Sequence, residues 1–516
     1  MKEERREMLD AKITLHDRHR FEMKLDVDLI PGKKNVYRVE TYFFIPRAMN
    51  VNPETYTKSV FYNSFQKYIR FKTPQMSLDK IADETVAVSP LNRISAGLKK
   101  ILSGSNDDKI ADSVYGEIKL LGCVVRGSVR DYVKFLSAEI ISAGSSPNEG
   151  TSRFSAIEEN GLGFASDVKK LISRIRALKT EISNPAVPAR LREGFGFFDE
   201  FLSLTLVDYL ALLLEDIRCG EGSVLRLSEL DKALSAIVNA QNGYRRTMGY
   251  PSVVQKGSGN ETLVYRRSVL KKFVSSVLHL QMETTEWQGA FQIFFGLAAG
   301  VAMLFTVLLL IFAQSRFAAN SAPFVVIVVV SYIFKDRIKD WLKLWFTASW
   351  TKWIADRGTS ITDPYSGQNI GVIKEAFSFV SDEAVPPEVS RGRNIDNITS
   401  VEEEGKPERV VKYEREVSLY PSRVSEFHER RRDLNDILRF NIVPLIAQAD
   451  DPIVDYLNLN EETGQLETLR CKRVYHINVV TKYSASPSNG GSVASLERIR
   501  IILTRDGIER LEKVPV

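Results

Sequence analysis

Histidines, cysteines and paired glycines are the residues of this sequence that could do chemistry. A histidine would serve as a metal ligand or a general base, but none of the five has a cysteine or carboxylate at metal-ligand spacing. They are His16, His19, His279, His428 and His476. Gly161-Leu-Gly163 and Gly194-Phe-Gly196 lack the third glycine, the preceding strand and the lysine of a phosphate-binding loop. With no serine elbow or kinase signature either, the sequence predicts no metal and no cofactor and leaves any catalytic residue unidentified.

Composition sets the class of protein and its compartment. The chain has 516 residues, 44% hydrophobic and 26% charged, which is typical of two or three globular domains. Its 70 Lys and Arg against 65 Asp and Glu leave a net charge of +5, too small to indicate a nucleic-acid partner. Three widely separated cysteines, Cys123, Cys219 and Cys471, favour a reducing compartment over a disulfide framework.

Two apolar runs in the middle of the chain are not typical of a soluble protein. Residues 289–313 carry no charge and would form a helix of about 37 Å, long enough to cross a bilayer. After Arg316 a second charge-free run, 317–334, would measure about 27 Å and barely span a core of roughly 30 Å. The short link permits only an antiparallel transmembrane hairpin. Gly296 and Gly300 form a small-xxx-small motif, which would pack against the second span, mediate self-association or, as such motifs are common by chance, have no role.

Tryptophan flanks this pair of runs on both sides. The five tryptophans of the chain are Trp287, Trp341, Trp345, Trp350 and Trp353. Because tryptophan prefers the headgroup level, residues 335–358 are predicted to form an amphipathic helix lying in the membrane interface. Lys339 and Lys343 would face anionic headgroups from its polar side. The alternative is an amphipathic helix that covers a soluble domain.

Positive charge around the runs predicts the orientation. Four Lys or Arg precede Trp287 closely and six lie in 335–357, whereas the link between the spans has only Arg316. The positive-inside rule then places both termini in the cytoplasm and the link outside. The segment 1–7 is charged and has no apolar run behind it, so no signal peptide is expected. These features predict a protein of the bacterial cytoplasmic (inner) membrane.

Periodicity divides the remainder of the chain. Alternating apolar residues over 21–29 and 37–45, with a turn at 31–34, predict a β-hairpin within residues 1–50. Residues 51–286 are predicted as a helical cytosolic domain whose last helix runs into the first span. Residues 359–408 are predicted as a mobile linker and 409–516 as an α+β cytosolic domain. That last domain would hold a helix over 427–445 and a hairpin turn at Asp506-Gly507.

The predicted fold is therefore a membrane protein with an antiparallel two-helix transmembrane hairpin, spans 289–313 and 317–334 within 287–334. A mainly α-helical N-terminal cytosolic domain opens with the β-hairpin, and a smaller α+β cytosolic domain follows at the C-terminal end. Whether the strands of the two ends share one sheet stays open.

One helix and one apolar stretch of the N-terminal half stand out. The helix 168–182 has a basic side opposite its apolar stripe, which is either a solvated face or a contact for headgroups or an acidic partner. Its cations are Lys169, Lys170, Arg174, Arg176 and Lys179. The stretch 197–214 resembles a span by length, but Asp199, Glu200 and Asp208 indicate a buried core helix.

Taken together, these patterns predict a membrane-anchored cytosolic scaffold or regulatory module. Its partners would be the lipid bilayer, an unidentified protein and, through the glycine motif, a second copy of the chain. One alternative is a membrane-tethered enzyme acting on a lipid or nucleotide. Another is an oligomeric channel or transport subunit, which the scarcity of polar residues in the spans disfavours, since only Gln292, Thr306 and Ser331 are clearly polar there.

Overall fold

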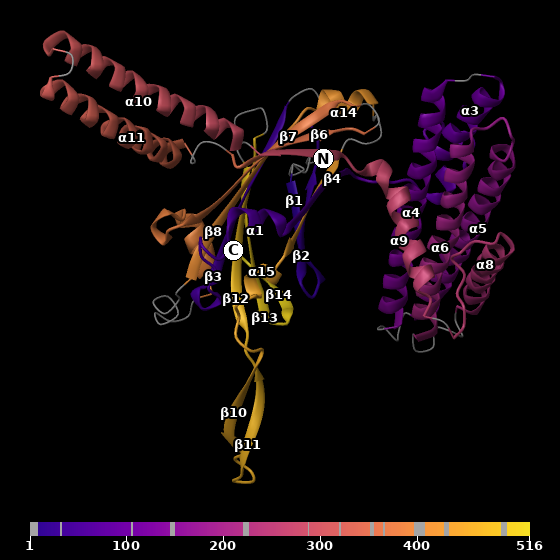
Figure 1. Ribbon diagram of the computed structural model, residues 1–516. Coiled ribbons are helices and arrows are strands. Elements are labelled where there is room, and N and C mark those ends of the chain that lie inside the picture. The colour runs from indigo at the N-terminus through magenta and orange to yellow at the C-terminus, as the bar shows by residue number, and fades with distance from the viewer. Residues whose placement is uncertain are drawn as a thin grey trace. The chain divides into compact units, whose positions relative to one another are not determined.

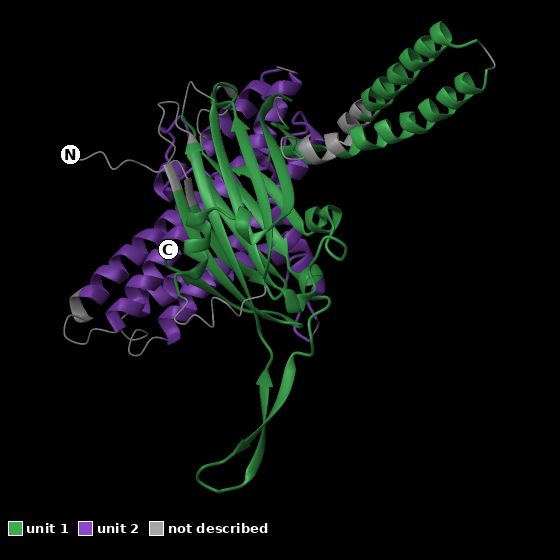
Figure 2. Ribbon diagram, turned by 90° about the vertical axis from the view of Figure 1, so that its left-hand side faces the viewer, with its two compact units in different colours: residues 1–71, 280–516 green, residues 72–279 purple. Residues whose placement is uncertain are grey.

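A computed structural model describes residues 9–516 except 31–33, 105–106, 145–149, 220–226, 258, 287, 319–320, 351–354, 365–366, 397–407, 428–432 and 487–492. The chain divides into two compact units, coloured separately in Figure 2. The sandwich unit comprises residues 1–71 and 280–516, and the helical unit comprises residues 72–279.

Two antiparallel sheets form the sandwich unit. The small sheet has the order β1-β2-β9-β4, with bounds Leu9–Asp17, Arg20–Val27, Leu434–Asn441 and Phe65–Phe71. The large sheet has the order β14-β13-β12-β3-β8-β7-β6-β5. Its bounds, in the same order, are Gly507–Val514, Val493–Thr504, Tyr475–Ser486, Asn35–Pro46, Glu408–Leu419, Asn369–Val380, Arg357–Thr362 and Gln281–Glu286. A separate two-stranded ribbon pairs β10 (Ile453–Leu459) with β11 (Leu466–Lys472).

Alternation along the strands builds the core between the two sheets. In β2 every second residue is buried, and Phe21 and Met23 pack in one cluster with Phe43 of β3 and Phe440 of β9. The next residue of β3, Phe44, points to the opposite face of the large sheet. There it packs with residues of and beside helix α12 (Pro387–Asn394). The large sheet is therefore covered on both faces, by the small sheet and by α12.

Each of the two sheets combines strands from both ends of the chain. β2 pairs with β9 in the small sheet, and β3 pairs with both β8 and β12 in the large one. The two strands predicted within residues 1–50 both form, but their predicted pairing as one hairpin is wrong, because they lie in different sheets. The hairpin that does form joins β1 to β2. Alternation reports which face of a strand is buried and carries no information about its partner.

Three further predictions for the sandwich unit are corrected. The helix expected over 427–445 is strand β9, whose first five residues are all buried, so that it shows no alternation. The linker expected over 359–408 contains β6, β7, η3 (Asp382–Ala384) and α12, with 397–407 outside the described residues. The helical domain expected to begin at residue 51 opens instead with the short α1 (Lys58–Asn63), capped by Thr57 and followed by strand β4. The hairpin turn at Asp506-Gly507 is confirmed, since it joins β13 to β14.

The remaining short elements of the sandwich unit are η1 (Arg47–Met49), α14 (Pro421–Phe427) and α15 (Val443–Ile446).

Helices of 5 to 37 residues make up the described part of the helical unit. They are α2 (Leu78–Ala82), α3 (Pro90–Leu102), α4 (Asp108–Gly144), α5 (Gly150–Ile182), α6 (Ala189–Cys219), α8 (Ser228–Thr247) and α9 (Glu261–Ser275). The apolar stretch 197–214 lies in α6, with Asp199 and Glu200 both buried, which confirms the core helix. The predicted domain 51–286 is too wide at both ends. At its C-terminal end α9 gives way to η2 (Ser276–Leu278) and then to β5, so no helix runs from it into the first apolar run.

Candidate functional site: a helical hairpin at a sheet edge

The two apolar runs form the antiparallel helices α10 (Gln288–Arg316) and α11 (Ala322–Trp350), which lie side by side (Figure 1). They are inserted between β5 and β6, which pair with each other from Gln281 opposite Thr362 to Glu286 opposite Arg357. Both ends of the helical hairpin therefore connect to the outermost pair of strands of the large sheet.

Helix α10 has the length and composition of a membrane span. Its segment Phe295–Arg316 has 22 mostly apolar residues, and only about a tenth of its most apolar part is buried. A core helix of the same composition would be mostly buried. Among the described residues this is the one helical segment long and apolar enough to cross a bilayer.

Small residues mediate the contact between the two helices. Ala298, Ala302 and Ala313 of α10 and Ser331 of α11 are each at most 2% exposed. Gly296 and Gly300 are exposed on another side of α10, where a Cβ atom added to either would meet no atom within 4 Å. Packing of these glycines against the second helix is therefore wrong for this structure. Their role in self-association stays a prediction.

Helix α11 is continuous, so the interfacial helix predicted over 335–358 is wrong as a separate element, because it continues the predicted second span along one axis and residues 357–358 belong to β6. Its charge-free part, 322–334, is about 20 Å long, shorter than the roughly 30 Å core of a bilayer. Beyond it Asp336 pairs with Lys339 at 3.3 Å, and the Lys343 ammonium lies 5.5 Å from the centroid of the Phe295 ring. The charged half of α11 thus lies beside the start of the apolar segment of α10.

The predicted aromatic belt is only partly within the described residues. Trp341 is 64% exposed on α11, and Lys339 and Lys343 are partly buried beside it. Trp287 and Trp353 are outside the described residues, as are the side chains of Trp345 and Trp350. The interfacial role of this group stays a prediction.

The five cations predicted as a surface on residues 168–182 separate into two groups on α5. Lys169 and Lys170 are exposed. Arg174 lies 3.4 Å from Glu84, and the Arg176 guanidinium stacks 3.9 Å from the centroid of the Tyr244 ring. These two cations, and Lys179, are engaged within the helical unit.

Lys179 belongs to a cluster around the buried carboxylate of Asp199. The Lys179 ammonium and the hydroxyls of Tyr244 and Tyr250 donate to Asp199 Oδ2 at 2.7, 2.6 and 2.7 Å. Burial alone would lower the pKa of Lys179, but these hydrogen bonds outweigh burial and raise it. The cluster ties α5, α6 and the end of α8 together.

Replacing Asp199 by alanine should destabilise the helical unit by about 2–4 kcal/mol, because three donors would lose their common acceptor. Hydrogen exchange over α5, α6 and α8 in the full chain would measure the loss. Lys232→Ala, which removes an exposed pair with Glu229, is the matched control and should leave exchange unchanged. Equal protection in both variants would contradict a stabilising role for the cluster.

A groove of about 390 Å³ lies between α5 and α8 and is called here the α5–α8 groove. Its apolar floor and cationic rim are formed by Lys169, Ile172, Ser173, Arg176, Ala236, Ile237, Ala240 and Gln241. Its volume falls within the range of ligand sites, about 300–1,000 Å³. The exposed Lys169 and the partly buried Arg176 form this rim, so two of the cations singled out in the sequence belong to a concave surface.

Charged residues are also enclosed between the two sheets of the sandwich, in a group called here the Arg415 cluster. Arg415 of β8 is fully buried and binds Asp436 of β9 through Nε at 3.1 Å and Nη2 at 2.9 Å. Its Nη1 lies 3.0 Å from Glu375 of β7, which also bonds Tyr413 and Lys67. The Tyr37 hydroxyl donates to Asp436 at 2.8 Å.

These bonds join strands of both sheets and leave each carboxylate of the Arg415 cluster with cationic and hydroxyl partners. Burial alone would raise the pKa of Glu375, but Arg415 and Lys67 outweigh it and keep that pKa below its ordinary value. Sequence analysis missed the cluster. The one sequence signal that could have indicated the cluster is a charged residue between apolar ones, such as Asp436. This residue lies in β9, which was predicted as a helix. The arrangement is suited to holding the sheets in register.

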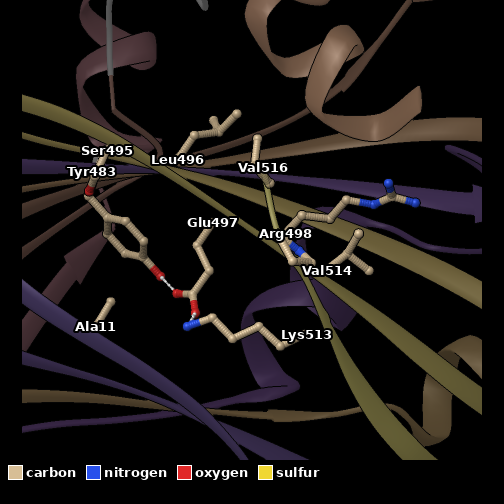
Figure 3. A pocket seen from close by; sticks show the side chains of 10 residues that line it. Ala11, Tyr483, Ser495, Leu496, Glu497, Arg498, Lys513, Val514 and Val516 are labelled. Carbon is tan, nitrogen blue, oxygen red and sulfur yellow. Dashed lines mark hydrogen bonds and ion pairs between the residues drawn. The ribbon is translucent and has the colours of Figure 1, made fainter. Parts of the chain in front are cut away.

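A smaller cavity, about 210 Å³, lies at the edge of the large sheet (Figure 3). On its wall Glu497 accepts hydrogen bonds from Tyr483 at 3.3 Å and from Lys513 at 2.7 Å. Arg498, also on the wall, directs its guanidinium away from this pair, to Asn478 and the carbonyl of Gly392. The carboxylate is thus already paired, and the cavity is smaller than most ligand sites.

Across the part of the chain that the structure describes, no group of three or more His, Cys, Asp or Glu side chains could hold a metal ion. Comparison of the chain with protein-family models, with curated proteins and with solved structures found no match.

Proposed function

We propose that this protein is a membrane-anchored scaffold or interaction module whose helical hairpin inserts into a bilayer. The exposure of α10 carries the proposal. Large apolar side chains along its length, such as Leu297, Leu304, Leu308 and Phe312, are more than half exposed. A contiguous apolar surface of this kind is rare on soluble proteins and is typical of a membrane or protein contact.

The distribution of charge supports an orientation for the anchor. Lys335, Arg337, Lys339 and Lys343 lie toward the sheet end of α11, whereas Arg316 is the one cation near the link. Under the positive-inside rule both units would then face the cytoplasm, with the link on the other side of a bacterial inner membrane.

The short apolar part of α11 determines the free-energy cost of placing this helix across a bilayer. A span about 10 Å shorter than the bilayer core costs a fraction of a kcal/mol per Å through local thinning. Lys335, Arg337 and Lys339 have long side chains that can extend to the headgroups. The longer apolar segment of α10 favours crossing, so we propose two spans with the charged half of α11 near the inner interface.

The scaffold part of the proposal is supported by the two units outside the hairpin. Each has its own core, and each presents a surface suited to a protein contact. These surfaces are the α5–α8 groove and the exposed leucines of the β10–β11 ribbon.

Cysteine labelling in cells tests the anchor and its orientation. In a chain whose exposed Cys219 and Cys471 are replaced by serine, new cysteines at Lys100, Asp451 and Ser315 report the two units and the link. We expect an impermeant maleimide to label position 315 in intact cells, and positions 100 and 451 only after the membrane is opened.

Labelling of all three positions only in opened cells would mean that the hairpin enters the membrane without crossing it. Labelling of position 451 in intact cells would contradict the proposed orientation.

A further inference from the structure

We propose that the tip of the β10–β11 ribbon of one copy of this chain docks into the α5–α8 groove of a second copy. The ribbon, residues 453–472, is called here the β-arm. The inference rests on the shape, apolar exposure and charge of two surfaces of the same chain, and it is independent of membrane insertion.

The β-arm is a well-formed element. Its strands pair in continuous register from Ile453 opposite Lys472 to Leu459 opposite Leu466. In the turn, Asn460 accepts two backbone hydrogen bonds through its side chain, and Gly464 adopts a φ of 66° that favours glycine. Salt bridges tie its base to the sandwich, from Lys472 to Glu509 at 2.6 Å and from Arg473 to Asp450 at 3.1 Å.

The outer half of the β-arm exposes apolar side chains that the sandwich does not cover. Leu457, Leu459 and Leu466 are 70%, 58% and 75% exposed, and their register places all three on one face of the ribbon. The ribbon pairs with no other strand of the described chain, as Figure 2 shows. A lone two-stranded ribbon is at best marginally stable in water, so burial of this face would stabilise it.

Charge identifies the kind of surface that would cover the tip. Glu461 and Glu462 are exposed in the turn. Glu467 lies on the other face of the ribbon, where Asn458 donates to it at 3.0 Å. Among the cations of the β-arm and its base, Lys472 and Arg473 are paired with carboxylates of the sandwich unit. Arg470 lies on the leucine face but toward the base, directly opposite Asp455. The free end therefore combines leucines with acidic residues, and it requires an apolar surface with a cationic rim.

The α5–α8 groove has this complementary chemistry. Ile172 and Ile237 supply apolar floor, the small side chains of Ala236 and Ala240 leave room above α8, and Lys169 and Arg176 supply the cationic rim. Lys170 adds a further exposed cation beside Lys169. In the docked state the leucines of the β-arm would contact the apolar floor of the groove, and the glutamates of its turn would lie against the cations of the rim.

Because the two surfaces differ and occur on every copy, the contact would be heterologous. Such contacts join copies head to tail and close into a ring or extend as a filament. On a membrane this would give the scaffold proposed above a repeated array of units.

The test uses two variants of the full chain in mild detergent, each with two exposed substitutions. The arm variant is Glu461→Lys with Glu462→Lys, and the groove variant is Lys169→Glu with Ala240→Glu. We expect the wild type to form oligomers at micromolar concentration and each variant alone to be at least about tenfold weaker in self-association. An equimolar mixture of the two should recover self-association, since it holds one intact arm–groove pair and one pair in which the charges of both surfaces are reversed.

Sedimentation velocity would measure these species, and hydrogen exchange would verify that each variant is folded. Lys99→Glu with Lys100→Glu, on the exposed side of α3, is the matched control and should leave oligomers intact. Monomers in every sample would overturn the proposal. Docking of an arm into the groove of its own chain would also give only monomers, and it would overturn the proposal as well. Oligomers unaffected by either variant would assign self-association to another surface, such as the glycines of α10, and would also overturn it.

Discussion

Replacing Arg415 by alanine is expected to destabilise the sandwich unit by about 3–5 kcal/mol, because Asp436 and Glu375 would stay buried without their guanidinium partner. For a unit of this size the thermal midpoint should fall by roughly 6–20 °C. All five tryptophans lie between residues 287 and 353, so tryptophan emission would not report the sheets. Hydrogen exchange over β8 and β9 is the measurement.

Two further variants make this prediction specific. Arg415→Met combined with Asp436→Asn removes the buried charge pair and should recover at least half of the loss, since Tyr37 can still donate to the amide oxygen. Arg505→Ala, which breaks the exposed pair with Asp451, should have no measurable effect. If β8 and β9 lose the same protection from hydrogen exchange in Arg415→Ala as in Arg505→Ala, the Arg415 cluster does not hold the sheets together.

The Arg415 cluster also predicts a response to acid. Burial would raise the pKa of Glu375, but Arg415 and Lys67 lower it below the ordinary value of 4.5. A carboxyl whose pKa is lower in the folded state stabilises the fold above its unfolded pKa. That contribution is lost as pH falls through the folded pKa. Sandwich stability should therefore decline below about pH 4.5, and the Arg415→Ala variant should lose this part of the decline.

Excision of the helical hairpin should move the protein from the membrane to the soluble fraction. In the variant a short Gly-Ser linker replaces residues 288–353, and Asp356 is kept because it bonds Tyr62 and the backbone of Phe377. The linker joins strands that already pair at Glu286 and Arg357, so the large sheet should be undisturbed. The effect should be nearly complete, because the excised segment carries the exposed apolar surface of α10.

Carbonate extraction of membranes measures this outcome, and hydrogen exchange of the soluble product would verify that the sandwich is intact. Excision of the β-arm, residues 453–472, is the matched control and should leave the protein in the membrane. A hairpin-free chain that still resists carbonate would show that another segment anchors the protein.

How much of this architecture was predictable depends on the range of the interactions concerned. The apolar helices α10 and α11 and strands such as β2 follow from local composition and period. The pairing of β2 with β9 does not, because alternation says nothing about a partner roughly 400 residues away along the chain. β9 was mistaken for a helix since burial on both faces removes the period of two.

The same distinction applies to the sites. The cations of α5 were visible as a pattern, but their division between the groove rim and internal pairs depends on α8 and α6. Lys179 illustrates this, because its partners Asp199 and Tyr244 come from other helices. The Arg415 cluster depends on contacts between five strands, and no local sequence signal specifies them.

Because each sheet combines strands from both ends of the chain, synthesis constrains the order in which the parts of this protein can fold. β2 and β3 leave the ribosome early, yet β9 follows roughly 400 residues later, which takes about 20–80 s at 5–20 residues per second. In that interval the helical unit can fold and α10 and α11 can enter the membrane, while β2 and β3 keep unpaired edges that favour aggregation. If the hairpin is the anchor proposed above, its insertion into the membrane would therefore precede closure of the sandwich. A chaperone that shields extended segments would be needed for the N-terminal strands until β8, β9 and β12 have been made.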